Sequence, residues 1–285
     1  MKKLLAAIVL VPAFLLLAGC GSSSSSDSTA TTAATAEACT PAQLDTQTKG
    51  TLTVATDKPA YPPYFEEDEP ANGEGFESAV AFAIGKQLGY APAKIKWTVE
   101  PFNSSYAPGP KSFDFDVNEI SITPAREKQV DFSSPYYTAN QAVVALKTSD
   151  AAKATSLADL KDVQIGVQIG TTSLTAVEEQ IEPSAEPQVF NNSTDVVTAL
   201  KNEQIDAVVV DLPTALYLTA AQVPAATVVG QFSAPGGDEW GALLAKDSSL
   251  TACVSKAIDA MRSSGELAQL NKRWMSQAAG APELH

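Results

Sequence analysis

The 285-residue chain has few of the residues that carry common enzyme chemistry. His285 is its only histidine and its last residue, so no Ser-His-Asp or Cys-His arrangement and no histidine-based zinc site is available to the body of the fold. Gly166 and Gly170 are too sparse for a phosphate- or dinucleotide-binding glycine loop, and no EF-hand pattern occurs. These absences favour binding over catalysis, and we expect no cofactor and no metal.

A long apolar run is also lacking. The stretch from Leu4 to Ala18 has about 15 residues, which suits a signal peptide and is short for a membrane span. It follows the basic pair Lys2-Lys3 and ends in Leu17-Ala18-Gly19-Cys20, which matches a lipobox. We therefore predict a lipoprotein signal peptide over residues 1–19 and a lipid on Cys20. An ordinary secretory signal with an incidental cysteine is the alternative.

Residues 20–38 consist almost entirely of Ser, Thr, Ala and Gly. Such a segment buries too little apolar surface to offset its ordering entropy, so we expect a lipidated flexible tether. Signal, lipid and tether together predict an extracytoplasmic protein, anchored to the outer face of the cell membrane through Cys20.

Cysteine is scarce, and its number is odd for an exported protein. If Cys20 carries the lipid, Cys39 and Cys253 remain. We predict a disulfide bond between them.

Basic residues are outnumbered by acidic ones, 19 to 33, for a formal net charge of −14. Loss of Lys2 and Lys3 with the signal peptide lowers this charge to −16. Such a chain is a poor partner for nucleic acid or for an anionic membrane surface, so we expect neither contact.

The hydrophobic periodicity alternates between strand and helix, which predicts an α/β fold. The run Ala207-Val208-Val209-Val210 is apolar on both faces, as in a strand covered by helices on both sides. The clearest expected strands are Leu52–Thr56, Ile95–Val99, Phe113–Ile122, Gln141–Leu146, Val163–Ile169, Asp206–Val210 and Gly241–Ala245, and the clearest helices are Glu77–Leu88, Thr172–Ile181, Thr194–Asn202, Leu250–Arg262 and Leu267–Met275.

Four segments at strand ends carry recognition chemistry. Prolines and aromatics follow the first strand, from Tyr61 to Phe65, and Asp211 places one carboxylate at the end of a buried strand. Thr123 is expected to cap a helix that starts at Pro124 and holds Arg126 in its first turn. The segment from Gln168 to Thr172 runs from a strand into a helix whose first N–H groups favour an anion.

Together these motifs make residues 50–276 resemble family 3 of the extracellular solute-binding proteins, the polar amino-acid binders of ABC importers. The resemblance rests on Ser121-Ile122-Thr123 with Arg126, on Val130-Asp131-Phe132-Ser133, and on Gln168 with Gly170-Thr171-Thr172. It implies a two-lobed fold of the type II periplasmic-binding-protein class, with two crossing hinge strands near Val143–Lys147 and Gln231–Gly236. Lobe 1 is then 50–142 plus 237–278, and lobe 2 is 147–232.

The resemblance also implies a binding site. Arg126 and the N–H of Thr172 would hold the ligand carboxylate, while Asp211 and Ser121 would hold its ammonium group. Tyr61 and Phe102 would form the wall of the side-chain pocket. The full set implied for the ligand is Tyr61, Phe102, Asn118, Glu119, Ser121, Arg126, Gln168, Thr171, Thr172 and Asp211.

Asn118-Glu119 departs from the family, which more often has small or neutral residues here. If Glu119 faces the ligand, it favours a cationic or amine-bearing molecule; a structural salt bridge is the alternative.

The resemblance implies a monomer that captures an amino-acid-like ligand and delivers it to an ABC importer permease. Two other functions share the scaffold. One is a dehydratase, in which Glu119 is the candidate acid, and the other is a sensor subunit that presents its closed form to a membrane receptor.

Overall fold

The computed structural model describes residues 39–275 and 281–285. The predicted signal peptide, the lipidation of Cys20 and the tether at residues 20–38 lie outside the described residues. Within the described part of the chain, no helix is long and apolar enough to cross a bilayer.

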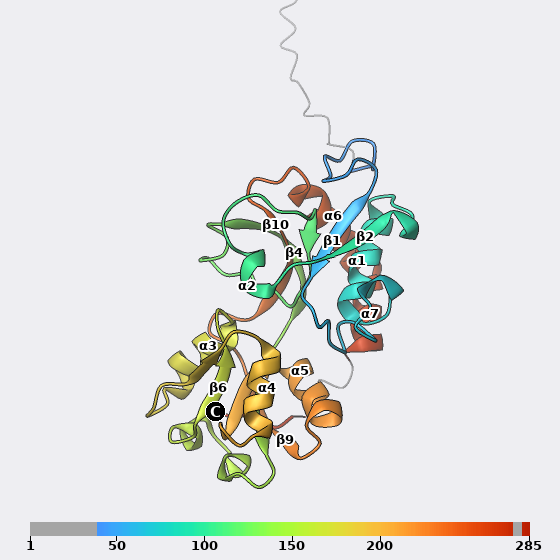
Figure 1. Ribbon diagram of the computed structural model, residues 1–285. Coiled ribbons are helices and arrows are strands. Elements are labelled where there is room, and N and C mark those ends of the chain that lie inside the picture. The colour runs from blue at the N-terminus through green and yellow to red at the C-terminus, as the bar shows by residue number, and fades with distance from the viewer. Residues whose placement is uncertain (1–38, 276–280) are drawn as a thin grey trace, which may run out of the picture. The chain divides into compact units, whose positions relative to one another are not determined.

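The fold is α/β and contains two five-stranded mixed sheets, which confirms the predicted fold class (Figure 1). We call the sheet that contains β1, together with its helices, the first lobe, and the sheet that contains β6 the second lobe. The first sheet has the order β2-β1-β3-β10-β4, with strands β1 (Leu52–Thr56), β2 (Ile95–Val99), β3 (Phe115–Asp116), β4 (Val130–Thr138) and β10 (Glu239–Ala245). The second has the order β7-β6-β8-β5-β9, with strands β5 (Gln141–Leu146), β6 (Ile165–Gln168), β7 (Gln188–Phe190), β8 (Ala207–Asp211) and β9 (Ala226–Phe232).

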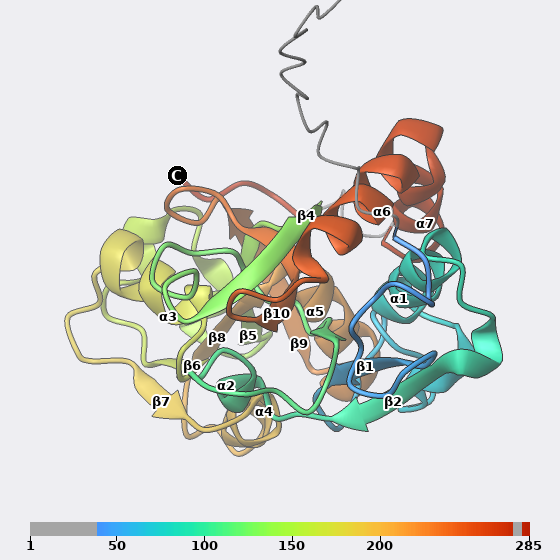
Figure 2. The same ribbon diagram turned by 90° about the horizontal axis from the view of Figure 1, so that it is seen from above.

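Helices cover the two sheets separately, as Figures 1 and 2 show. In the first lobe α1, α6 and α7 pack together, and α6 lies against β4. In the second lobe α3 and α4 contact both β6 and β8, while α5 contacts β5 and β8. The helices are α1 (Phe76–Gln87), α2 (Phe102–Ser105), α3 (Thr172–Ala176), α4 (Ser193–Lys201), α5 (Leu212–Tyr217), α6 (Thr251–Ser264) and α7 (Glu266–Trp274); short 3-10 turns lie at Pro70–Asn72, Pro92–Lys94, Asp150–Lys153 and Leu157–Leu160, and π-helical turns at Val177–Ile181 and Leu218–Gln222.

The central strand of the second lobe shows why these residues form a doubly covered sheet. Ala207 and Val209 of β8 belong to one hydrophobic cluster, and Val208 belongs to another on the opposite face. Successive side chains of a strand point to opposite faces, so an all-apolar strand needs helices on both sides. The sequence-based expectation for this run is confirmed.

The predicted disulfide bond is present. Cys39 is bonded to Cys253 of α6, with 5.5 Å between their Cα atoms. The bond fixes the start of the described chain to the helical layer of the first lobe.

Two strand connections carry the chain between the lobes. β4 ends at Thr138 in the first sheet, and β5 begins at Gln141 in the second. This crossing precedes the predicted one at Val143–Lys147, because Gln141 already pairs with Asp211. Gln141 and Ala142 therefore lie in the second lobe rather than in the first, and the return crossing lies at residues 233–238, between β9 and β10.

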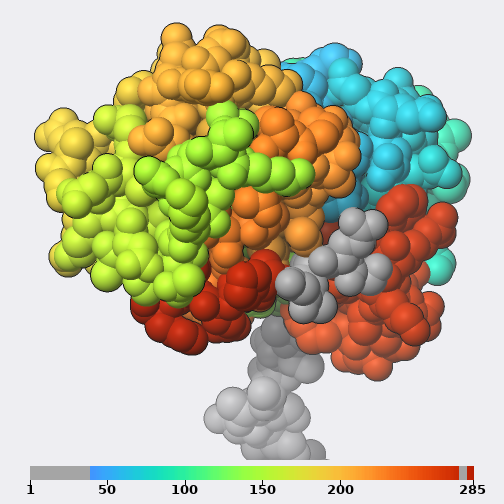
Figure 3. Space-filling model, turned by 90° about the horizontal axis from the view of Figure 1, so that it is seen from below, coloured from blue at the N-terminus to red at the C-terminus, as the bar shows by residue number. Residues whose placement is uncertain are grey.

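The chain passes between the lobes a third time near its end. Met275 belongs to the core of the first lobe. Beyond residues 276–280, Glu283 pairs in parallel fashion with Gln231 of β9, and Leu284 is buried in the core of the second lobe. The C-terminus accordingly lies at the second lobe in Figure 1, and the last residues, in the darkest red, lie against it in Figure 3.

Two local predictions are wrong. The strand expected at Phe113–Ile122 is reduced to Phe115–Asp116, since the backbone turns at Glu119, where φ is +49°. The helix expected after Thr123 is a turn that leads directly into β4. Thr123 still caps it in the predicted manner, because its Oγ1 accepts a hydrogen bond from the Arg126 N–H at 3.3 Å.

Candidate ligand-binding cavity

A cavity of about 570 Å³ lies between the lobes and is lined by residues of both. Its size is in the usual range for small-molecule sites. Every residue implied for the ligand lines it: Tyr61, Phe102, Asn118, Glu119, Ser121 and Arg126 from the first lobe, and Gln168, Thr171, Thr172 and Asp211 from the second.

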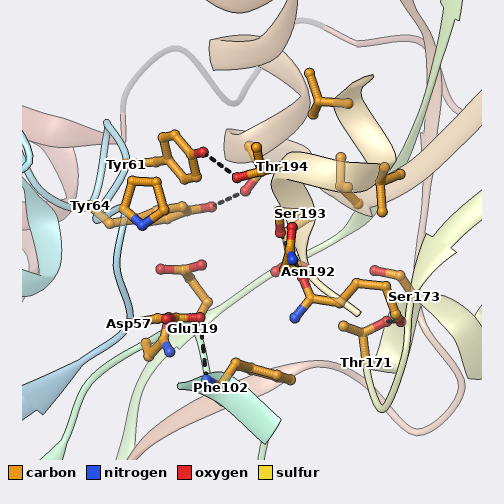
Figure 4. Close-up of a pocket in the computed structure, with 18 of the residues that line it drawn as sticks. Asp57, Tyr61, Tyr64, Phe102, Glu119, Thr171, Ser173, Asn192, Ser193 and Thr194 are labelled. Carbon is orange, nitrogen blue, oxygen red and sulfur yellow. Dashed lines mark hydrogen bonds between the residues drawn. The ribbon is translucent and has the colours of Figure 1, made fainter. Parts of the chain in front are cut away.

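Loops at the carboxyl ends of strands form the wall of the first lobe. Asp57 follows β1 directly, and its Oδ2 accepts a hydrogen bond from the backbone N–H of Phe102 at 3.2 Å. Glu119 follows β3 on the same wall. Figure 4 shows Asp57 and Glu119 close to each other, with Tyr61 and Tyr64 nearby.

The wall of the second lobe is built in the same way, as expected for ligand sites of open α/β sheets. Gln168 and Asp211 are the last residues of β6 and β8. Thr171 caps α3 by accepting a hydrogen bond from the Leu174 N–H, and Oε1 of Gln168 accepts one from the Ser193 hydroxyl at 2.6 Å. Ser193 and Thr194 begin α4, and Thr194 faces Tyr61 of the first lobe in Figure 4.

Hydrogen bonds join the two walls. The Tyr64 hydroxyl lies 2.8 Å from that of Thr214, and the Ser121 hydroxyl lies 3.3 Å from that of Thr172. The hydroxyl oxygens of Tyr61 and Thr194 lie 2.9 Å apart. The lobes thus meet directly around the cavity.

Arg126 is the buried cation of the site. Its guanidinium donates to the carbonyl oxygen of Ser121 at 2.7 Å and, across the lobes, to that of Gly170 at 2.9 Å. The guanidinium carbon lies 5.4 Å from the ring centre of Phe102 and 4.8 Å from that of Tyr106. Burial lowers the pKa of Arg126, and neighbouring Tyr106, Asp238 and Asp211 raise it. A planar guanidinium with five N–H donors can hold a carboxylate in addition to these carbonyls.

Asp211 is the complementary anion, and a network at the hinge holds it. Its Oδ1 accepts a hydrogen bond from the Gln141 amide at 2.7 Å, and the same amide donates to Asp238 at 2.7 Å. Burial, followed by the nearby Asp238, raises the pKa of Asp211, while Gln141 and Arg126 lower it. A cation bound beside Asp211 would favour its ionised form.

Acidic side chains predominate in the cavity lining, which includes Asp57, Glu119, Asp195 and Asp211 against Lys58 and Arg126. Lys58 is already paired with Asp68, with 3.2 Å between their charged atoms. Glu119 lines the cavity and makes no salt bridge among the described residues. The cavity is thus more acidic than a neutral zwitterion requires.

Several lining residues are absent from the predicted ligand set. Asp57 and Tyr64 carried a signal, because they lie in the segment that follows the first strand; Tyr217 and residues Asn192 to Thr194 carried none that separates them from other loop residues. Gln141 and Asp238 lie behind the cavity and are recognisable only from the fold. Among the described residues, no group of His, Cys, Asp and Glu is arranged to hold a metal ion.

Comparisons with known proteins agree with this geometry. A sequence model of the bacterial extracellular solute-binding proteins, family 3, matches residues 52–277. The arginine-binding extracellular protein ArtP of Bacillus subtilis is 33% identical over 222 residues, covering 74% of this chain and 82% of that protein. The glutamine-binding protein GlnH of an ABC transporter of the same organism is 28% identical over 284 residues, covering 97% and 98%. The structure of an ancestral arginine-binding protein bound to glutamine is similar with a TM-score of 0.68 at 32% identity, covering 80% of this chain and 98% of that one.

Proposed function

Because this chain belongs to the bacterial extracellular solute-binding proteins of family 3, and its relatives are amino-acid-binding proteins of ABC importers, we propose that it captures an amino acid with a cationic side chain. The observation that carries this proposal is the excess of carboxylates in a cavity shared by two lobes.

The α-carboxylate and α-ammonium groups of the ligand are each assigned to residues of the two lobes. Arg126, with the Thr172 N–H, holds the carboxylate, and Asp211, with Ser121, holds the ammonium. A buried zwitterion is costly unless both of its charges are paired. The two partners come from different lobes, so the ligand itself joins them and binding is coupled to closure.

The side chain of the ligand is assigned to the first lobe. With Arg126 and Asp211 engaged by the α-groups, Asp57 and Glu119 remain as uncompensated carboxyl groups near Tyr61 and Phe102. A guanidinium or ammonium group supplies the missing positive charge, and a bidentate guanidinium matches carboxylate geometry best. The arginine-binding names of two of the similar proteins support this assignment.

Anchoring completes the proposed function. The lipobox at Cys20 and the polar segment that follows it support an extracytoplasmic protein, tethered to the outer face of the membrane and presenting its closed form to a permease. The dehydratase alternative has less support, because the family and the relatives above are binding proteins.

A thermal-shift screen tests the proposal. A ligand at 100 times its Kd stabilises the folded state by about 2.7 kcal/mol, so a true ligand gives a clear rise in unfolding temperature. L-arginine and L-lysine should give large shifts, and L-citrulline, the neutral analogue of arginine, a small one. No shift with any amino acid would contradict the function, and equal shifts with arginine and citrulline would contradict the cationic specificity.

A further inference from the structure

A pair of glutamates lies behind the acidic wall of the cavity. Glu77, from α1, is completely buried, and its Oε1 accepts the backbone N–H of Glu119 at 2.7 Å as well as the Tyr136 hydroxyl. Its Oε2 is also buried, and within the described chain no N–H or hydroxyl donor reaches it. One oxygen of the Glu77 carboxyl group thus accepts two hydrogen bonds, and the other accepts none.

Glu119 supplies the second carboxyl group. Its backbone lies in the left-handed region, with φ of +49°, which is unfavourable for a residue with a side chain. This conformation directs the N–H toward Glu77 while the side chain lines the cavity. The hydrogen bond from the Glu119 N–H to Glu77 Oε1 places the two residues in contact, and two neighbouring carboxyl groups in a buried site favour a state in which one of them holds a proton.

We propose that Glu77 and Glu119 share one proton in the ligand-free protein and release it to solvent when a cationic side chain binds beside Glu119. The inference rests on the proposed function and couples ligand binding to the release of one proton. In the free protein the pair carries one negative charge. On binding, Glu119 ionises, the pair carries two, and the positive charge of the ligand offsets the added one.

The surroundings of the pair favour the protonated form. Burial is the largest cause that raises the pKa of Glu119, followed by Glu77, Asp211 and Asp57. Burial likewise raises the pKa of Glu77, against the hydrogen bonds from Tyr136 and Glu119, which lower it. The groups that act on the pair from adjacent elements are acids or phenols, namely Asp57 after β1, Tyr64 in the next loop, Asp116 of β3, Tyr136 of β4 and Asp211 of β8. The basic residues of the cavity, Arg126 and Lys58, are engaged by Gly170 and Asp68.

The shared proton makes Glu119 a specificity-determining residue. A protonated carboxyl can donate to a neutral amide oxygen, whereas an ionised one prefers a cation. Affinity for a cationic amino acid should therefore rise with pH while the free pair is protonated, by up to about tenfold per pH unit for one released proton. Affinity for a neutral analogue should rise less steeply, because it leaves the Glu77–Glu119 pair protonated.

Calorimetry in buffers of different ionisation enthalpy counts the released proton. L-arginine is titrated into the protein in phosphate and in imidazole, at several values between about pH 5 and 8, and L-citrulline serves as the neutral probe. We expect roughly half to one more proton to be released per arginine than per citrulline at some pH in this range, because the α-ammonium groups of the two ligands act alike on Asp211. Equal proton release with arginine and with citrulline throughout the range overturns the inference and leaves the proposed function intact. If neither arginine nor lysine binds, the function fails and the inference with it.

Substitutions of the two glutamates test whether they are the residues that hold the released proton. Glu119→Gln and Glu77→Gln should each abolish the extra proton release with arginine, because neither leaves a carboxyl pair. Asp195→Asn is the control: it removes a carboxylate from the cavity lining but keeps the pair, so the extra release should persist. Extra release that survives in both glutamine variants would overturn the assignment, and if one of them fails to fold, the other decides.

Discussion

At the scale of single residues, the site depends on a buried cation whose partners are divided between the lobes. Arg126 lies over two neighbouring aromatic rings and donates to Ser121 on its own lobe and to Gly170 on the other. Gly170 has a φ of +74°, and a Cβ there would lie 2.2 Å from the Tyr106 hydroxyl oxygen. A glycine at this position therefore lets the first lobe approach closely.

Replacing Arg126 by alanine should weaken binding of L-arginine by about 2–5 kcal/mol, or roughly 30-fold to several thousand-fold, because the carboxylate loses its charged partner. Isothermal titration calorimetry measures the change. Arg262→Ala is the control, since Arg262 is exposed and pairs with Asp259 away from the cavity. Near-normal affinity of Arg126→Ala would remove this residue from the site.

Asp116 of β3 gives a prediction that does not depend on the ligand. It is completely buried, and within the described chain both carboxylate oxygens lack a hydrogen-bond partner. Burial, then Glu77, raises its pKa well above the usual value. A raised folded-state pKa means that the stability from this group is full below about pH 3.9, its unfolded value, and is lost as pH rises through the folded value.

Asp116→Asn removes the buried charge and should therefore stabilise the protein by about 1–3 kcal/mol near pH 8 and by little near pH 4. Urea unfolding at both pH values measures the difference, with exposed Glu178→Gln as the control. If the substitution changed the free energy of unfolding equally at both pH values, the charge of Asp116 would not be the cause of the change.

The family resemblance led to residues that line the cavity, among them Ser121, Arg126 and Asp211, but not to those behind them. Gln141 and Asp238 could not be predicted, because their roles depend on the crossing of two chain segments that are distant in sequence.

At the scale of elements, the C-terminal segment forms an isolated bridge to the edge strand of the second sheet. The N–H of Gln231 donates to the carbonyl of Pro282, and the N–H of Leu284 donates back to the carbonyl of Gln231, both at 2.8 Å. The close approach requires that Gly230 has no side chain, because a Cβ there would lie 2.6 Å from Leu284 and 2.8 Å from the Pro282 oxygen. The segment thus covers part of the otherwise exposed edge of β9.

Leu284→Ala should lower the stability of the second lobe by about 2–5 kcal/mol, because a buried leucine leaves a cavity. Val189→Ala, at a half-exposed position of the same lobe, should cost no more than about 0.5 kcal/mol. Denaturant unfolding distinguishes the two. Equal stability of both variants would show that the C-terminal segment does not contribute to the core.

Regular elements were predicted well where periodicity and pairing coincide. β1, β2 and β5 lie at the predicted positions, because each alternates or is apolar over its whole length. The run from Phe113 to Ile122 also alternates, but it buries Phe113, Val117 and Ile120 without pairing along its length. Burial pattern alone cannot separate a buried loop from a strand.

At the scale of the whole described fold, the two lobes are linked by three chain passages and are bridged by direct contacts around one cavity. The sequence predicted two of these passages through the family resemblance. The third could not be predicted, since residues 281–285 are too few to show a strand period.

The disulfide bond adds a constraint at the same scale. It joins residues 214 positions apart, so nearly all of the described chain lies within the closed loop. On the chain-entropy model such a loop contributes about 4–5 kcal/mol by restricting the unfolded chain. The cysteine count predicted this pair, because one cysteine of three matched the lipobox.

The central claim is that one cationic amino acid is held by opposite charges from the two lobes. A crystal structure of the protein grown with L-arginine tests it most directly. We predict the ligand carboxylate on the Arg126 guanidinium, its α-ammonium on the Asp211 carboxylate, and its guanidinium against Asp57 and Glu119. A ligand bound to one lobe alone, or placed away from Arg126 and Asp211, would contradict the account.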